Sequence, residues 1–319
     1  MRVSKSLVEF VCTLLLACNA VLLAQTGDCP QRTFVANVAD HGVVPKGLHN
    51  DDFLITYHGK KLVPISAVYS EGPRRIIILI DVSGSMGSAV ENSVKWEIAR
   101  LAAENLVRAL APGSRVGLIT FSTTTHRESQ LSVNREPILE WLNSPKVRDA
   151  HVLKGRTALY DAVESAVDQL SPFEPGDSIY LVTDGGENTS GTRKSKVQSA
   201  LWDSRVRLFT LMLPAEKYAA PPEFADREDV AALSNDSGGF VEWFDVSENV
   251  RRVDETIKQQ LRVSALQLSS QISAFYSLAV GLPEDPKKKK RWEVTLSDSD
   301  KRRKSVWVGY PHEVPPCRM

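Results

Sequence analysis

The sequence is short of the features that mark several protein classes. It has no net charge, because 39 lysines and arginines balance 39 aspartates and glutamates. Without an overall basic field, the composition does not favour nucleic acid as a partner. The six histidines show no spacing typical of metal ligands, so a histidine-based zinc site is not expected. Beyond residue 24, no apolar run is long enough to span a bilayer.

Cysteine is also scarce. Of four cysteines, Cys12 and Cys18 lie in an apolar segment near the start, and Cys29 and Cys317 lie near the two ends of the remaining chain. In an exported protein, two such cysteines favour a disulfide, and we expect the pair Cys29–Cys317. The alternative is two unpaired thiols.

The N-terminus has the form of a secretory signal. Arg2 and Lys5 precede an apolar run at residues 10–24, with cleavage expected after Ala24. This pattern predicts an exported protein, either periplasmic, on the cell surface or secreted. A membrane anchor is the alternative, but the run is short for a spanning helix.

A lipid anchor is a second alternative for this segment. Residues 15–18, LLAC, resemble the lipobox of bacterial lipoproteins, with Cys18 as the modified residue. Attachment to a membrane is expected only if Cys18 is lipidated.

The stretch at residues 74–87, RRIIILIDVSGSMG, joins an apolar run to a polar loop. The run predicts a strand buried on both faces, as in a parallel sheet. It ends in Asp81, and Ser83 and Ser85 follow at alternate positions on a glycine-bearing loop. One charged and two neutral oxygens that face a single point suit Mg2+, Mn2+ or Ca2+. By itself, the pattern is equally typical of a turn that caps the next helix.

Two later stretches place further oxygen ligands beside other elements. Thr157 lies on a glycine-containing loop before an expected helix, and Asp184 ends a second apolar strand before two glycines. Strands that alternate with helices predict an α/β fold with a doubly wound, mostly parallel, Rossmann-like sheet. The loops at the carboxyl ends of such strands converge on one crevice. We therefore expect the two stretches to join Asp81, Ser83 and Ser85 there.

This order of residues resembles the metal-ion-dependent adhesion site of von Willebrand factor type A domains, such as integrin I domains. That pattern is D-x-S-x-S, then a threonine, then an aspartate that opens a DG turn, and all five positions match. The resemblance covers residues 74–262 and implies a bound divalent cation, Mg2+ or else Mn2+ or Ca2+. It also implies that Ser83, Ser85 and Thr157 bind the metal directly. Asp81 and Asp184 would act chiefly through water or hydrogen bonds.

The domain organisation follows from the pattern of elements. We expect a signal peptide at 1–24, a type A domain at 73–266, and β segments at 30–72 and 267–319. Each β segment is too small to bury a core alone, so the two are expected to pack together as one small β domain. Some bacterial exported proteins related to von Willebrand factor A, which this chain resembles, carry β segments on both sides. Gly309-Tyr310 matches the end of their last segment.

The spacing of apolar residues predicts the main helices. Apolar residues at helical spacing indicate helices at 94–109, 137–142 and 159–170. A last helix is expected to begin at a cap formed by Ser247, before strands that begin at Ile272.

These residues favour a binding module over an enzyme. Two carboxylates roughly neutralise a divalent cation, which then stays electrophilic and can accept an aspartate or glutamate carboxylate from a partner protein. One alternative is a serine hydrolase with Ser85 as nucleophile, Asp184 as the acid and His312 as the base. Another is a structural domain whose metal only stabilises the fold.

Overall fold

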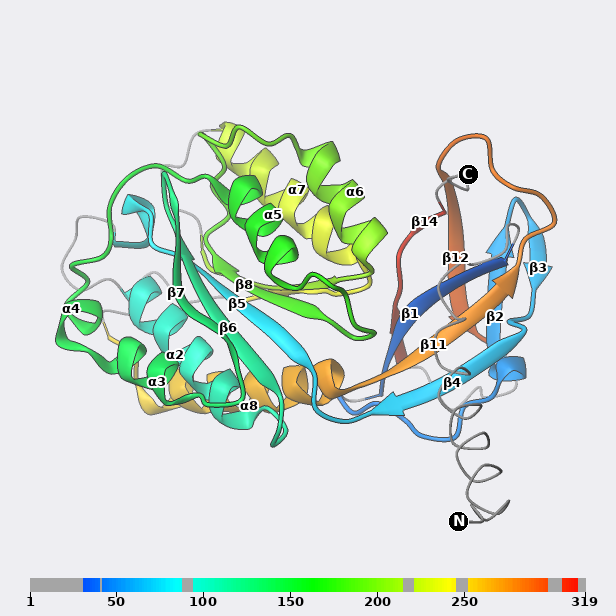
Figure 1. Cartoon of the computed structure of the whole chain (residues 1–319), viewed down its shortest axis with the longest axis horizontal. Helices are drawn as coiled ribbons and strands as arrows, with labels where there is room; N and C mark the ends of the chain where they lie inside the picture. The colour runs from blue at the N-terminus through cyan, green and yellow to red at the C-terminus, as the bar shows by residue number, and fades with distance from the viewer. Residues whose placement is uncertain are drawn as a thin grey trace, which may run out of the picture.

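The computed structural model describes residues 31–40, 42–87, 94–214, 221–244, 252–297 and 306–314, without the side chains of 221–225. These residues form an α/β lobe and a smaller β lobe (Figure 1). Within this part of the chain, no helix has the length and apolar character needed to cross a membrane.

The α/β lobe contains a six-stranded sheet in the order β10-β9-β8-β5-β6-β7. All neighbouring strands are parallel except β7, which pairs antiparallel with β6. Every residue of the central strand β5 is buried, because helices cover both faces of the sheet. The strands are β5 (Arg75–Asp81), β6 (Arg115–Phe121), β7 (Thr125–Ser132), β8 (Ser178–Thr183), β9 (Arg207–Met212) and β10 (Val241–Trp243).

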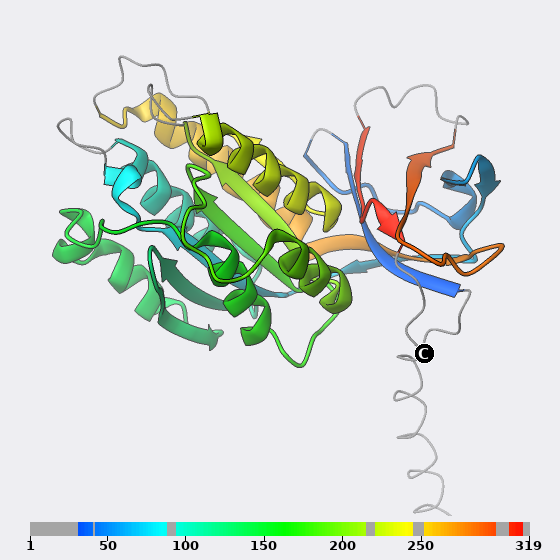
Figure 2. The same ribbon diagram turned by 90° about the horizontal axis from the view of Figure 1, so that it is seen from above.

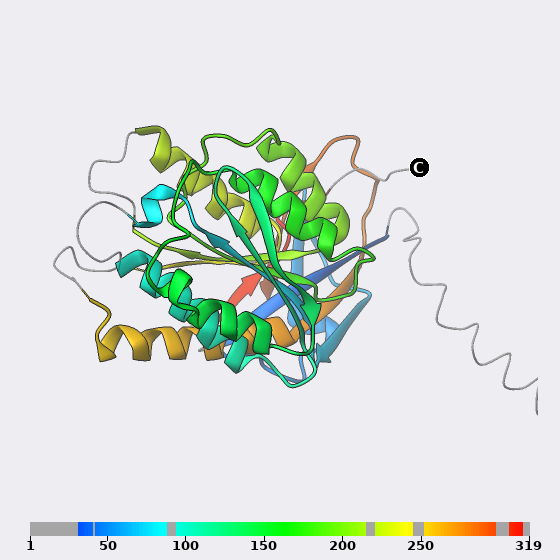
Figure 3. The same ribbon diagram turned by 60° about the vertical axis from the view of Figure 1, so that its left-hand side comes forward.

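Helices lie on both faces of this sheet (Figure 3). Alternate β5 side chains serve the two layers, so that Ile76 and Ile78 join one core and Ile77 and Leu79 join the other. The helices of the first face are α2 (Val94–Ala109), α3 (Glu136–Asn143), α4 (Pro145–Arg148) and α8 (Glu255–Ser273). The helices of the second face are α5 (Leu159–Gln169), α6 (Lys194–Ser204) and α7 (Pro221–Asp236).

The β lobe combines strands from both ends of the chain (Figure 2). Its two sheets have the orders β13-β1-β11-β4 and β14-β12-β2-β3, and they enclose a third apolar core. The strands of the N-terminal half are β1 (Gln31–Asp40), β2 (Phe53–Tyr57), β3 (Lys60–Leu62) and β4 (Ser66–Glu71), with the short 3-10 helix η1 (Asn50–Asp52). Those of the C-terminal half are β11 (Ala274–Gly281), β12 (Lys290–Leu296), β13 (Val306–Gly309) and β14 (Glu313–Val314).

The chain enters and leaves the α/β lobe at neighbouring points. Strand β4 leads through residues 72–74 into β5, and helix α8 leads directly into β11. The two crossings are joined, because Gly72 N donates to Ser273 O at 3.0 Å and Glu71 pairs with Ala274. The α/β lobe is thus inserted between the two halves of the β lobe.

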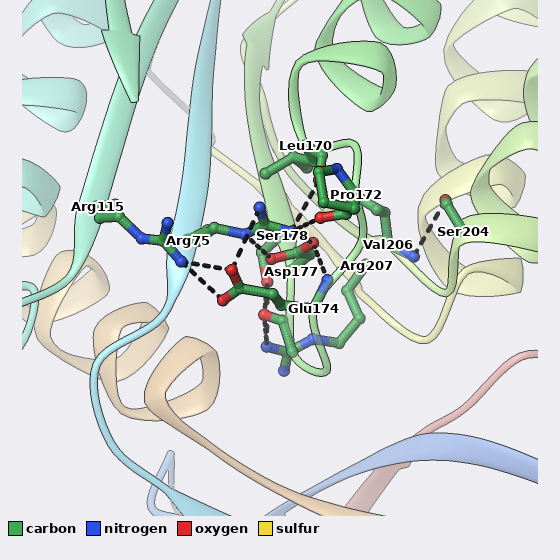
Figure 4. A network of polar contacts seen from close by, with 11 residues as sticks. Arg75, Arg115, Leu170, Pro172, Glu174, Asp177, Ser178, Ser204, Val206 and Arg207 are labelled. Atoms are coloured by element: carbon green, nitrogen blue, oxygen red, sulfur yellow. Dashed lines mark hydrogen bonds and ion pairs between the residues drawn. The ribbon is translucent and has the colours of Figure 1, made fainter. Parts of the chain in front are cut away.

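Two buried arginines, Arg75 and Arg207, form hydrogen bonds at the end of the six-stranded sheet that faces the β lobe (Figure 4). Arg75 pairs with Asp177 and donates to the carbonyls of Leu170 at 2.8 Å and Pro172 at 2.7 Å. Arg207 is fully buried and donates to Ser178 Oγ at 3.0 Å and, across the boundary between the lobes, to Asn37 Oδ1 at 2.7 Å.

The predicted fold class is confirmed: a doubly wound, mostly parallel sheet with a flanking β lobe built from both ends of the chain. The edge strand near residues 126–131, the short helix near 137–142 and the hairpin turn at His58-Gly59 also match the sequence-based expectations.

The last helix differs from its prediction. Helix α8 runs to Ser273, so residues 267–273 are helical, although they were assigned to the C-terminal β segment, and the strand starts at Ala274 rather than at Ile272. The helix is capped by Asp254, not by Ser247, which lies outside the described residues. The physical reason is that the buried face of α8 continues through Leu268 and Ile272 against the same core.

Other predictions fall on parts of the chain that are not described. These are the signal segment with Ala24 and Cys18, and the disulfide between Cys29 and Cys317.

Candidate metal centre

The candidate site lies at the carboxyl ends of β5 and β8, at the edge of the sheet away from the β lobe (Figure 1). These two strands are adjacent and parallel, so their terminal residues emerge side by side. Strand β5 ends at Asp81 and continues into the 3-10 helix η2 (Gly84–Gly87), whereas β8 ends at Thr183, directly before Asp184.

Hydrogen bonds connect four of the five expected residues. Ser83 N donates to Asp81 Oδ1 at 2.8 Å, and the hydroxyls of Ser83 and Ser85 lie 3.1 Å apart. Ser85 Oγ donates to Asp184 Oδ1 at 3.2 Å. The loop after β5 and the adjacent end of β8 thus join Asp81, Ser83, Ser85 and Asp184 in one chain of hydrogen bonds.

Thr157, the fifth residue, is buried on a neighbouring loop. That loop is joined to the first, because Gly84 N donates to Gly155 O at 3.1 Å. The Thr157 N–H donates to Asn188 Oδ1 at 3.0 Å. Its hydroxyl faces the turn after Asp184, since a Cβ added to Gly186 would lie 3.6 Å from Thr157 Oγ1. The structure thus places Thr157 beside the other four residues, without a hydrogen bond that joins its hydroxyl to them.

The turn after Asp184 depends on glycine. Gly185 has a φ of +93°, in the left-handed region, and a Cβ there would lie 2.4 Å from Arg227 Cγ. Arg227 holds this turn from outside by donating to the Asp184 carbonyl at 2.6 Å. The glycine after the aspartate is therefore required by both conformation and space.

The two carboxylates share a buried, negatively charged environment. Asp81 is fully buried, and burial together with the charge of Asp184 raises the pKa of Asp81 to about 7. Hydrogen bonds from Ser83 and from Thr183 Oγ1, at 2.7 Å, act in the opposite direction on this pKa. A cation beside the pair would relieve the repulsion that the pKa of Asp81 reflects.

Several residues at the site were missed by the sequence analysis. They are Lys95, Thr183, Asn188 and Arg227. Lys95 Nζ lies 2.8 Å from Asp184 Oδ2 and 3.1 Å from the Ser85 carbonyl oxygen. Thr183 directly precedes Asp184 and Asn188 follows it by four residues, so their closeness in the sequence was a usable signal. Nothing in the sequence pointed to Lys95 or Arg227.

The donor set fits a hard divalent cation. It offers two carboxylates and three hydroxyls, and all donors are oxygen atoms. Asp81, Ser83, Ser85, Thr157 and Asp184 are the residues that would hold the ion. No cluster of three or more His, Cys, Asp or Glu that could hold a metal occurs among the described residues, but a set built mainly on hydroxyls is of a different kind.

The parallel strand topology and the hydroxyl side chains at the carboxyl ends of β5 and β8 define the class of this lobe. Residues 76–187 match the family model of the von Willebrand factor type A domain. This chain therefore carries a von Willebrand factor type A domain, as the sequence pattern predicted. A comparison with curated proteins finds no match.

Solved structures that are similar to this chain have low sequence identity to it. The conserved hypothetical protein BatB from Bacteroides thetaiotaomicron is 19% identical, with 63% of this chain and 98% of that chain covered and a TM-score of 0.46. The pilus adhesin SpaC from Lactobacillus rhamnosus GG is 16% identical, with 68% and 34% covered and a TM-score of 0.45. A von Willebrand factor type A structure from Catenulispora acidiphila is 11% identical, with 86% and 75% covered and a TM-score of 0.45.

Proposed function

We propose that this chain is an exported protein-binding module that captures a carboxylate of a partner protein through a bound divalent cation. The observation that carries the proposal is the hydrogen-bonded chain from Asp81 through Ser83 and Ser85 to Asp184, with Thr157 beside it. The apolar N-terminal segment supports export.

The charge balance of the site explains why a bound cation could bind a carboxylate of a partner protein. Two carboxylates balance a divalent ion, and the three hydroxyls add oxygen ligands without further negative charge. An ion held in this way keeps a net attraction for one more anionic ligand. An aspartate or glutamate side chain on a partner protein supplies that ligand.

The placement of the hydroxyls disfavours the serine-hydrolase alternative. The Ser85 hydroxyl contacts Ser83 and Asp184, whereas His312, the base of that alternative, lies 3.2 Å from Asp236 at the end of α7. His312 lies between β13 and β14 of the β lobe, whereas Ser85 lies in η2, directly after β5 of the α/β lobe. The purely structural alternative differs from the proposal in requiring no partner.

Calorimetric titration tests the metal site. The wild-type protein should bind one Mg2+ or Mn2+, and Asp81→Ala and Thr157→Ala should abolish binding by removing a carboxylate and a hydroxyl ligand. Asp168→Ala is the matched control, because Asp168 is an exposed carboxylate on α5, away from the site. Undiminished binding in both site variants would refute the assignment.

A second measurement separates capture from a structural role. Immobilised wild-type protein should retain a partner in Mg2+ and release it into EDTA, and Thr157→Ala should not retain it. If metal binds and raises the melting temperature but retention is the same in EDTA, the structural alternative replaces the proposal.

A further inference from the structure

Lys95 places a positive charge inside the candidate metal centre. It lies in the first turn of α2, and its side chain is only 16% exposed. Its ammonium contacts Asp184 Oδ2 at 2.8 Å and the Ser85 carbonyl at 3.1 Å. The same ammonium therefore contacts two of the three loops that carry the expected ligands.

This contact uses the remaining oxygen of Asp184. Oδ1 accepts from Ser85 Oγ, and Oδ2 accepts from Lys95. A divalent cation held between Asp81 and Asp184 would have to lie close to the ammonium. Two positive ions at such a distance repel each other, and partial burial reduces the screening by water and salt.

We propose that Lys95 is a tethered cation that competes with the divalent ion for Asp184 and so weakens metal binding at this site. The inference rests on the proposed function. In the metal-free protein the ammonium neutralises one of two neighbouring carboxylates and stabilises their loops. When a divalent ion enters, the ammonium has to leave Asp184, which four rotatable methylene groups allow.

The consequence is a site that fills only at a sufficient concentration of divalent ion. Metal-dependent capture of a partner would then respond to the divalent ions outside the cell rather than being permanently active. Lys95 sets the concentration at which this response occurs.

Calorimetric titration with Mg2+ tests the competition. Lys95→Met keeps much of the side-chain length without the charge, and we expect it to bind Mg2+ roughly tenfold tighter or more, the effect of removing a unit charge within about 5 Å of a divalent ion. Lys95→Gln should also bind more tightly, and Lys95→Arg should resemble the wild type. Lys194→Gln is the matched control, because Lys194 pairs with Asp229 at 2.6 Å outside this site.

Thermal unfolding supplies a second readout. Without metal, Lys95→Met should melt at a lower temperature than the wild type, because Asp184 is left without its counter-charge. Added Mg2+ should raise its melting temperature by more than that of the wild type, because tighter binding to the folded state stabilises it more.

The outcomes separate this inference from the proposed function. Tighter binding by Lys95→Met, or binding by that variant alone, supports competition. Equal or weaker binding by Lys95→Met, with a wild type that binds, overturns the competition and leaves the metal site standing. No Mg2+ binding by any of the proteins overturns both.

Discussion

At the scale of single residues, Glu242 is a partly buried acid on the edge strand β10. Burial raises its pKa above the usual value of 4.5, and a hydrogen bond from Ser264 on α8 only partly offsets this. A raised pKa in the folded state means that the folded protein holds the proton more tightly than the unfolded chain. Glu242 therefore costs no stability below pH 4.5, and its cost grows as the pH rises through the folded-state pKa.

We expect Glu242→Gln to be more stable than the wild type at pH 8 and equal to it at pH 4, because glutamine is uncharged and still accepts from Ser264. Urea unfolding at the two pH values measures the free energy of unfolding. Glu293→Gln, an exposed glutamate on β12, is the control and should change little at either pH. A Glu242→Gln protein that is no more stable at pH 8 would contradict the argument.

The sequence identified the candidate ligands but not the residues that contact them from elsewhere. Asp81, Ser83 and Ser85 were found because they alternate on one loop, and Asp184 because it ends an apolar strand. No sequence pattern of this kind marks Lys95 as part of the site. It reaches Asp184 only because α2 packs against the sheet beside β8, a contact between distant parts of the chain.

At the scale of elements, helix α8 depends on its N-cap. Asp254 has an extended backbone, with φ −87° and ψ 179°, and its Oδ1 accepts from Ile257 N at 2.9 Å. We expect Asp254→Ala to lose about 1 kcal/mol of unfolding free energy, since one N–H of the first turn loses its partner. Urea denaturation measures the loss.

Asp254→Ser provides the control for this cap. Serine keeps an oxygen that can accept from Ile257 N, so its loss should be well below that of alanine. Equal losses for serine and alanine would show that the cap hydrogen bond is not the cause.

The strength of the periodic signal decided which elements could be predicted. The strands β5, β8 and β9 are fully buried and read as continuous apolar runs. Helix α6 was missed, because Val197 and Leu201 are its only buried apolar residues and the rest of its surface is polar or partly exposed. The end of α8 was misplaced because apolar residues at 272–280 suit either a helix or a strand.

At the scale of the whole molecule, Arg207 joins the two lobes. Its guanidinium donates to Asn37 Oδ1 at 2.7 Å and to the carbonyls of Gln271 at 2.8 Å and Ile272 at 2.9 Å. It also lies over the ring of Phe275, 5.0 Å from the centroid. Burial lowers the pKa of Arg207 to about 9, which still leaves it charged at neutral pH.

We expect Arg207→Met to lose about 3 kcal/mol or more of unfolding free energy, because several buried acceptors on both lobes lose their donor. Chemical denaturation followed by circular dichroism measures this. Asn37→Ala removes one of these acceptors and should cost less. A loss for Arg207→Met no greater than that for Asn37→Ala would mean that the network does not hold the lobes together.

The sequence by itself determined the strand–helix alternation of the α/β lobe and the alternation of oxygen ligands after β5. Both are local properties, set by the burial of neighbouring residues and by the geometry of one loop. The tertiary structure decided which strands pair in the β lobe, such as β1 with β11 and β13, and it brought Lys95 to Asp184. These depend on contacts between residues far apart in the chain, whose free energy is gained only when the whole fold forms, so no local pattern records them.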